Sequence, residues 1–417
     1  MQLSVSTPYR ENSIVNIARA AAENAELQRF YTTLYSARWQ GTARRVPLAG
    51  PLLGKELGRR GFVGIPPDSV ADVAILPELI QVAARRLLGQ RRANVSADLM
   101  YRSKARFDVA VASRLDEEPA GALVGMYAAS LESFRTVHRQ GGLAVLNFVN
   151  SHPVEHNRYL LELAGLKMPH HELVPDWVTS RVEAELELAD LVLAPSRFVA
   201  EQLVAYGVLP GKIATLPYGV DLSAFHPPEQ PARARRTLEC LYVGQISHRK
   251  GIRVLLEAAR RCQRLPVRFR LIGPIVSREV LDWLPENVRY EGATLPGGVA
   301  EAMREADLFL LPTIEDSFAL VIFEAMATAL PVIATTHAGS SEFIENGEDG
   351  LIVPAGEVST ITKAIQRLVE QPELRSAIGE AARRKVESTH SWEAYGGRVI
   401  AAVRARRELL ASRNAIG

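Results

Sequence analysis

The chain has 417 residues, too many for one compact core, so two domains are expected. Its formal net charge of +2 is too balanced to indicate a nucleic-acid partner, and 47% hydrophobic with 23% charged residues is ordinary for a globular protein. No apolar run reaches the roughly 18 residues that span a bilayer, and the first residues are typical of a strand rather than a signal peptide. Cys240 and Cys262 give neither a disulfide framework nor metal-ligand spacing, which favours buried thiols in a cytoplasmic protein.

The first half of the chain alternates short apolar runs with helical patterns. Strands are predicted at residues 2–6, 107–112, 122–127, 143–149, 191–194 and 213–217. Residues 30–105 are hard to assign, although 77–88 has a helical pattern. Apolar strands that alternate with helices indicate a parallel sheet covered on both faces.

The second half repeats this alternation more regularly, after a stretch rich in proline and arginine at 218–237 that is typical of an interdomain linker. Strands are predicted at 238–244, 267–273, 308–311 and 331–335, and helices at 253–260, 299–305, 318–329, 341–346, 358–370 and 373–388. We therefore expect an α/β protein with domains at 1–217 and 238–388 and a last helix in 389–417. Ligands of such doubly wound sheets bind beyond the carboxyl ends of the strands.

Glu324 is the one formally charged side chain between Asp316 and Glu342, and it lies in a predicted helix that is apolar around most of its circumference. Such a helix is normally buried. A buried carboxylate without partners costs several kcal/mol or takes up a proton. Glu324 therefore needs a polar partner, and a ligand hydroxyl and an internal arginine both meet that need.

Asp316 stands eight positions before Glu324, where a helix cap is also expected. The two acids, separated by seven residues, are followed by Ala-Met-Ala, the strand at 331–335 and Gly339. This pattern resembles the two-acid motif of the family 4 (group 1) retaining glycosyltransferases. The resemblance covers roughly 180–400 well, including segments 189–198 and 216–227, and the first 180 residues weakly. It departs at Asp316, because the family usually has a glutamate there, one methylene longer.

The resemblance implies the GT-B fold, in which two doubly wound parallel-sheet, Rossmann-like domains face each other across a cleft. Residues 1–217 would bind the acceptor and 238–388 the nucleotide sugar. The helix in 389–417 would return to the first domain, with Trp392 and Tyr395 packed there. The implied reaction moves a sugar from a nucleotide diphosphate to a hydroxyl acceptor, such as a glycan or lipid-linked glycan. Anomeric configuration would be retained, without metal or other cofactor.

The segment from Val243 to Gly251 follows one strand and precedes a helix, which suits a diphosphate. It resembles the family's Gly-Arg-Leu…Lys-Gly segment: Lys250 matches the lysine, but Gln245 replaces the arginine. Arg249 is a candidate to supply the missing charge, and a solvated lysine at a helix start is the alternative for Lys250. The resemblance assigns the donor to Gly244, Gln245, Lys250, Asp316, Ser317, Phe318, Ala319, Leu320 and Glu324.

On the acceptor side, His152 follows the strand at 143–149, where relatives carry a histidine near the transferred sugar. A structural histidine is equally expected there. The resemblance makes His152, Asp316 and Lys250 the catalytic candidates. The acceptor candidates are Tyr9, Arg10, Asn12 and His156. Glu342, after Gly339, is expected to orient its loop.

Two alternative functions on the same fold remain open. A nucleotide-sugar epimerase would isomerise its substrate without an acceptor, and a non-catalytic sugar-binding relative would show no turnover at all. Membrane contact on the inner face is a separate open question. A basic segment attracts anionic lipid, although a solvated helix face explains it as well. This segment contains Arg85, Arg86, Arg91, Arg92, Arg102, Lys104 and Arg106.

Overall fold

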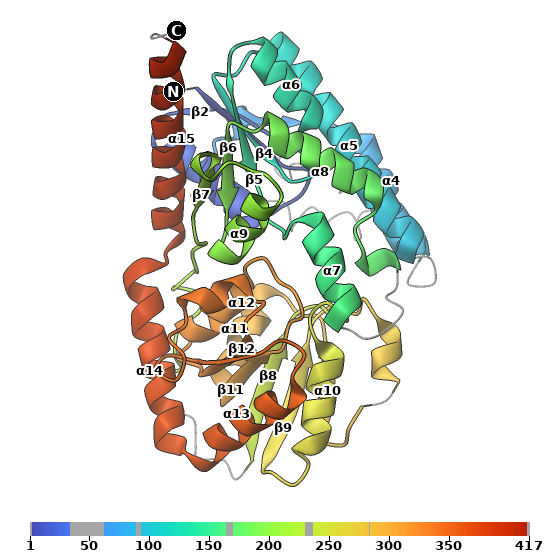
Figure 1. Cartoon of the computed structure of the whole chain (residues 1–417), viewed down its shortest axis with the longest axis vertical. Coiled ribbons are helices and arrows are strands. Elements are labelled where there is room, and N and C mark those ends of the chain that lie inside the picture. Colours follow the sequence, from blue (N-terminus) through green and yellow to red (C-terminus); the bar gives the residue numbers. More distant parts are fainter. Residues whose placement is uncertain are drawn as a thin grey trace.

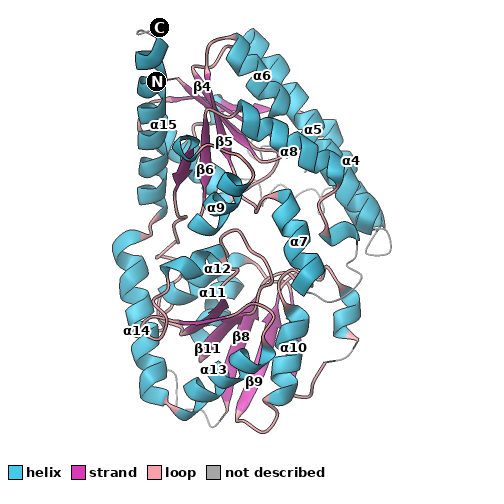
Figure 2. Cartoon of the chain, viewed as in Figure 1, coloured by secondary structure: helices cyan, strands magenta, loops and turns pink. Residues whose placement is uncertain are grey.

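Two parallel β-sheets, each lying between helices, form the two lobes of the molecule (Figures 1 and 2). The computed structural model describes residues 2–33, 62–88, 93–163, 170–229, 237–282 and 284–414. The expected linker, 218–237, therefore falls partly outside the described residues. The fold is of the GT-B type, as the family resemblance implies.

The sheet of the first lobe has seven parallel strands in the order β3-β2-β1-β4-β5-β6-β7. Its strands are β1 Leu3–Ser6, β2 Leu27–Thr32, β3 Val70–Asp72, β4 Ala122–Met126, β5 Leu143–Asn147, β6 Leu191–Ala194 and β7 Ile213–Thr215. The helices of this lobe are α1 Asn12–Glu23, α4 Ile75–Leu88, α5 Ala93–Glu117, α6 Leu131–Arg139, α7 Pro153–Leu163, α8 Asp176–Leu188 and α9 Arg197–Ala205. Every residue of β1, β4, β5 and β6 is buried, because helices cover both faces of the sheet.

The sheet of the second lobe has six parallel strands in the order β10-β9-β8-β11-β12-β13. Its strands are β8 Leu238–Val243, β9 Val267–Ile272, β10 Val288–Gly292, β11 Leu308–Leu311, β12 Val332–Thr335 and β13 Leu351–Val353. Its helices are α10 Ile252–Arg261, α11 Pro296–Glu305, α12 Leu320–Ala327, α13 Val358–Glu370 and α14 Pro372–Thr389. Strand order reverses between β8 and β11 here, and between β1 and β4 in the first lobe. Ligands of open α/β sheets bind at such switch points.

The last helix, α15 (Trp392–Asn414), crosses back along the first lobe (Figure 1). It packs closely on α1, since a Cβ on Gly396 would lie 2.6 Å from the Cβ of Ala20. Arg404 forms an ion pair with Glu26 at 3.0 Å. At the start of α15, the rings of Trp392 and Tyr395 pack against Tyr218 at the lobe junction. The helix therefore fastens the two lobes together.

The prediction of a strand at 107–112 is wrong, because these residues lie inside α5. Phe107, Val111 and Leu115 are buried at helical spacing, and a 25-residue helix overrides the local alternation of apolar residues. The segment expected as a helix at 341–346 is instead a 3₁₀ turn at Gly339–Phe343. Both cysteines are buried and free, as expected. Within the described ranges, no helix is long and apolar enough to cross a membrane.

Candidate active site

A first cavity of about 440 Å³ opens where β8 and β11 end, at the switch point of the second sheet. It brings together all the expected donor residues except Gln245. It is lined by Val149, Tyr218, Phe225, Val243, Gly244, Lys250, Thr294, Pro296, Val299, Leu311, Asp316, Ser317, Phe318, Ala319, Leu320, Val321 and Glu324. Strand ends, the Gly244 loop and the start of α12 thus meet in one apolar pocket with three charged groups.

Glu324 lies on α12 with its side chain at the cavity and half-buried. In the described part of the chain, no side chain or backbone group lies within hydrogen-bond or ion-pair distance of its carboxylate. Burial raises the pKa of Glu324 to about 7. The internal arginine that would have made this glutamate structural is therefore missing from the described residues, and its carboxylate remains open to a ligand.

The raised pKa of Glu324 predicts that nucleoside binding depends on pH. Hydroxyl donors favour the charged carboxylate, so binding should weaken as the pH falls below about 7, by up to about tenfold per unit. Above that value affinity should level off. Calorimetry with an unphosphorylated nucleoside avoids the titration of phosphate groups. Glu324→Gln should abolish this pH dependence, and an unaltered dependence in the variant would contradict the assignment.

Lys250 and Asp316 form an ion pair at the wall of the cavity. Asp316 also accepts hydrogen bonds from the backbone N–H groups of Phe318 (3.4 Å) and Ala319 (3.0 Å), so it orders the turn before α12 as well. Burial lowers the pKa of Lys250. Lys250 thus faces the cavity rather than solvent, and a bound anion would compete with Asp316 for its ammonium group.

Glycine is required at the residue that follows Lys250. Gly251 has a φ of 71°, and a Cβ there would lie 1.8 Å from the carbonyl oxygen of Pro312. This close approach brings the start of α10 against the end of β11. Ala319, Leu320 and Val321 line the same cavity at the start of α12, where the first N–H groups of a helix have no intrahelical acceptor. The cavity therefore combines a lysine with a helix N-terminus, both suited to an anion.

A second cavity, of about 340 Å³, lies between the lobes near the ends of β1 and β4. It is lined by Tyr9, Ala97, Met100, Tyr101, Lys104, Tyr127, Asn150, Ser151, His156, His171, Glu172, Leu173, Val174, Gln245, Ser247, Arg249 and Val276. Gln245, expected beside the donor diphosphate, lies here and not in the first cavity. The backbone turns after Gly244, so neighbouring residues of one loop face different cavities.

Two of the four expected acceptor residues, Tyr9 and His156, line the second cavity. His156 spans a contact between the lobes: Nδ1 lies 2.8 Å from Glu315 and Nε2 lies 3.0 Å from the carbonyl oxygen of Glu172. Arg10 and Asn12 are exposed and line neither cavity. Arg10 precedes α1, and Asn12 is its first residue.

His152, expected beside the transferred sugar, lines neither of these two cavities. Its ring stacks on Tyr206 with centroids 3.9 Å apart, and its backbone N–H donates to the Gln202 side chain at 3.0 Å. Burial lowers the pKa of His152 to about 4. The ring packs beside α9 in its neutral form, and its Nδ1 is buried without a partner among the described residues.

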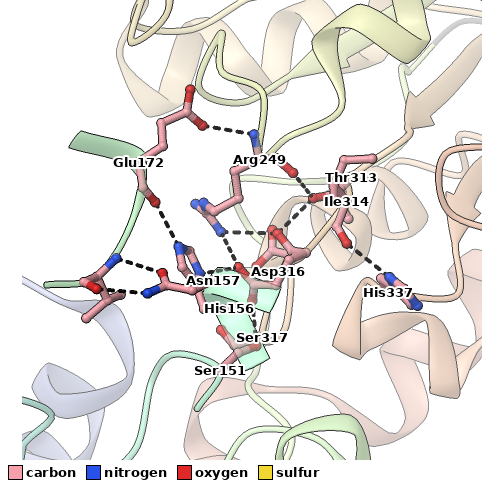
Figure 3. A network of polar contacts seen from close by, with 12 residues as sticks. Ser151, His156, Asn157, Glu172, Arg249, Thr313, Ile314, Asp316, Ser317 and His337 are labelled. Atoms are coloured by element: carbon pink, nitrogen blue, oxygen red, sulfur yellow. Dashed lines mark hydrogen bonds and ion pairs between the residues drawn. The ribbon is translucent and has the colours of Figure 1, made fainter. Parts of the chain in front are cut away.

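Glu315, which the sequence did not single out, contacts polar residues of both lobes. Figure 3 shows the surrounding polar network, in which Ser151, His156 and Arg249 are labelled. The carboxylate of Glu315 accepts from Ser151 Oγ at 2.5 Å and contacts His156 from the first lobe, and Arg249 lies 3.5 Å away on the second. Burial opposes its charge, but His156 and Arg249 hold the pKa of Glu315 below its ordinary value. In the sequence, the feature that could have pointed to Glu315 is its position next to Asp316.

We expect Glu315→Gln to lower stability, because one variant removes a carboxylate with 2% exposure from three partners. Breaking a buried pair costs about 3 kcal/mol, which corresponds to a melting temperature lower by about 3 °C if a chain of this length unfolds as one unit. Since the pKa is depressed, this stabilisation is present above the ordinary glutamate pKa and lost as the pH falls below it. Calorimetric melting with exposed Glu301→Gln as control checks this, and equal melting temperatures would contradict it.

A second contact between the lobes involves Glu342, which was expected to orient its loop. Its carboxylate accepts from the backbone N–H groups of Arg197 (2.8 Å) and Phe198 (3.3 Å), at the start of α9. Beside it, Ser196 Oγ donates to the carbonyl oxygen of Ser317 at 2.7 Å. Gly339 permits this approach, since a Cβ there would lie 2.0 Å from the same carbonyl. The loop before α12 is thus held from both lobes.

Residues 237–371, which contain the first cavity's catalytic candidates, match the family of glycosyl transferases group 1. The D-inositol 3-phosphate glycosyltransferase of Kribbella flavida is 29% identical over 254 residues, 55% of this chain and 60% of that protein. The sulfoquinovosyl transferase SQD2 of Arabidopsis thaliana is 28% identical over 221 residues, 49% of this chain and 42% of that protein. The chain thus matches about half the length of these curated relatives.

Among solved structures, the sucrose-phosphate synthase of Thermosynechococcus elongatus superposes with a TM-score of 0.67 at 18% identity, covering 99% of this chain and all of that one. HepE of Anabaena, solved with UDP and glucose, gives 0.66 at 14% identity, covering 97% of this chain and 99% of that one. These likenesses establish the GT-B fold. The chain carries a glycosyl transferases group 1 domain in its second lobe.

Proposed function

We propose that this chain is a retaining, metal-independent glycosyltransferase that moves a sugar from a nucleotide diphosphate to a hydroxyl acceptor. The observation that carries the proposal is the carboxylate of Glu324, which has no partner among the described residues and lies in the cavity at the β8/β11 switch point. A half-buried carboxylate without a partner is unfavourable unless a ligand completes it. Ribose hydroxyls are donors of the right kind, since two of them can share one carboxylate.

In this proposal Lys250 and the first N–H groups of α12 hold the diphosphate. Both line the cavity with Glu324, and both favour negative charge. Asp316, which now pairs with Lys250, would accept from hydroxyls of the transferred sugar once the diphosphate takes over the lysine. Gly244 lets the loop backbone lie close to the donor.

The barrier is the departure of the diphosphate from a sugar that becomes cation-like. Lys250 and the N–H groups stabilise the charge that develops on the leaving oxygen, and a fixed arrangement away from water makes this stabilisation large. No covalent nucleophile is part of the proposal. His152 is not given a role, because its ring packs on Tyr206.

The second cavity is proposed as the acceptor site. At three places, two consecutive residues of the chain line different cavities. Val149, Gly244 and Lys250 line the first cavity, and their neighbours Asn150, Gln245 and Arg249 line the second. The cavities therefore adjoin along these segments, and an acceptor hydroxyl in the second would approach a sugar bound in the first. A glycan or lipid-linked glycan is the proposed acceptor, in a cytoplasmic protein that meets the inner face of the membrane if the acceptor is lipid-linked.

A panel of nucleoside diphosphates and their sugars tests the proposal. UDP and UDP-glucose come first, because HepE of similar fold was solved with UDP and glucose. We expect one diphosphate to raise the melting temperature, and its sugar to be consumed when an acceptor is added. Isomerised nucleotide sugar without acceptor would instead make the protein an epimerase, and binding without any turnover would make it a non-catalytic relative.

A further inference from the structure

Lys104 is a buried cation that faces the second cavity, and among the described residues it has no hydrogen-bond or ion-pair partner. The sequence placed it in a basic segment exposed to solvent or lipid, but its residue exposure is 5% and it lines the cavity between the lobes. The rest of that segment differs: Arg102 is exposed and paired with Asp98, and Arg106 is exposed. Arg91 and Arg92 lie outside the described residues, as do the side chains of Arg85 and Arg86.

The ammonium group of Lys104 is surrounded by aromatic rings. It lies 5.2 Å from the ring centroids of Tyr9 and Tyr101 and 5.7 Å from that of Tyr127. No carboxylate, carbonyl or hydroxyl of the described residues accepts a hydrogen bond from it. Ring faces offset part of the cost of burying a cation. They leave three N–H donors unused beside an open cavity.

The acidic groups near this lysine are occupied elsewhere. Glu172 lines the same cavity, but it accepts from the backbone N–H groups of His248 (3.2 Å) and Arg249 (3.0 Å) and from Ser277. Glu185 accepts from the N–H groups of Ala128 (2.7 Å) and Ser130 (2.8 Å). Within the described residues, neither carboxylate lies at ion-pair distance from Lys104.

Two further polar side chains of the cavity can donate hydrogen bonds. Arg249 lines it, although its guanidinium also contacts Glu315. His171 lines it as well, and its Nε2 is buried without a partner among the described residues. Within the described ranges, the charged side chains that line this cavity are therefore two cations, Lys104 and Arg249, and one carboxylate, Glu172, whose oxygens already accept hydrogen bonds.

We propose that Lys104 forms an oxyanion subsite in the second cavity, so that the acceptor carries a phosphate ester. Only the identification of the ligand as the acceptor rests on the proposed function. The anion site itself is inferred from the residues that line the cavity. A phosphate offers three acceptor oxygens, which suits three unused ammonium donors and the ring nitrogen of His171. The phosphate belongs either to a soluble molecule or to a lipid headgroup.

Binding is measured on the full chain saturated with the nucleoside diphosphate that binds best, which blocks Lys250. Glycerol 3-phosphate is titrated by calorimetry against glycerol, and vesicles of phosphatidylcholine with and without phosphatidic acid are used for co-sedimentation. We expect saturable binding in at least one phosphate arm. Glycerol 3-phosphate binding assigns a soluble ester, and binding confined to phosphatidic acid assigns a lipid-borne one. If neither glycerol 3-phosphate nor phosphatidic acid binds, the proposal is overturned.

Lys104→Met should reduce phosphate affinity at least tenfold, and Lys104→Arg should restore much of it. Arg102→Gln removes the same charge from the outer face of α5 and should change affinity less than twofold. Equal losses in Lys104→Met and Arg102→Gln would mean a general charge effect and would overturn the subsite. Nucleotide affinity, measured on the same samples, should be unchanged, so a failure of donor binding is told apart from a failure of this site.

Chemical protection keeps the proposal testable if the variants do not fold. In the wild-type protein, reductive methylation of Lys104 followed by mass spectrometry should slow at least fivefold when the bound phosphate ester saturates the cavity. Methylation of other lysines should be unaffected. Equal methylation of Lys104 with and without the ester would contradict the subsite.

Discussion

Glu324→Gln is expected to weaken nucleoside diphosphate binding by about ten- to a hundredfold while the protein stays folded. A hydrogen bond to a charged group contributes about 1.5–3 kcal/mol, and the variant replaces two such bonds with weaker bonds between neutral groups. Calorimetry of the best-binding diphosphate measures the loss. Glu301→Gln, on the exposed face of α11, is the matched control and should bind like wild type.

The same variant should not lower stability. The pKa of Glu324 is raised by burial from 4.5 to about 7, so its charge makes the free folded protein less stable as the pH rises through that range. Removing the charge should leave the melting temperature at pH 8 unchanged or raise it. A clearly lower melting temperature would mean that Glu324 has an internal partner and is structural.

Lys250→Met is expected to lower kcat/KM by about a hundred- to a thousandfold. It removes the cation from the wall of the first cavity, where it would stabilise charge on the leaving diphosphate. Affinity for an unphosphorylated nucleoside should remain, since Glu324 is untouched. Steady-state kinetics and nucleoside calorimetry measure the two effects separately.

Arg253→Met is the control for Lys250, because Arg253 is an exposed cation in the first turn of the same helix, α10. It should keep wild-type kinetics. If Lys250→Met lost nucleoside and diphosphate binding equally, the lysine would be structural. In that case its pairing with Asp316 would be its whole role.

The strands of the second lobe could largely be predicted from the sequence, because a strand buried on both faces is a short apolar run. Those at 308–311 and 331–335 are of this kind. Strands β2 and β10 were missed, since Arg29 and Arg289 interrupt their apolar character at positions less deeply buried. The prediction of a strand at 107–112 was wrong because the alternating apolar residues there belong to the long helix α5.

Some residues of the candidate site could likewise be predicted from the sequence, and others could not. Residues joined by one local motif, such as Asp316 and Glu324, came together in the first cavity. Residues whose roles depend on how the lobes meet could not be assigned: Glu315 pairs with His156 across 159 positions of sequence. Lys104 looked like one charge of a basic surface, because sequence does not tell which face of a helix a second lobe covers.

The most direct test of the central claim compares ribose with deoxyribose. Wild type and Glu324→Gln are each titrated with the best-binding nucleoside diphosphate and with its 2′,3′-dideoxy counterpart. If Glu324 holds the ribose hydroxyls, either change alone weakens binding about as much as both together. If the two losses simply add, Glu324 does not contact the ribose, and the donor site assigned to the first cavity is wrong.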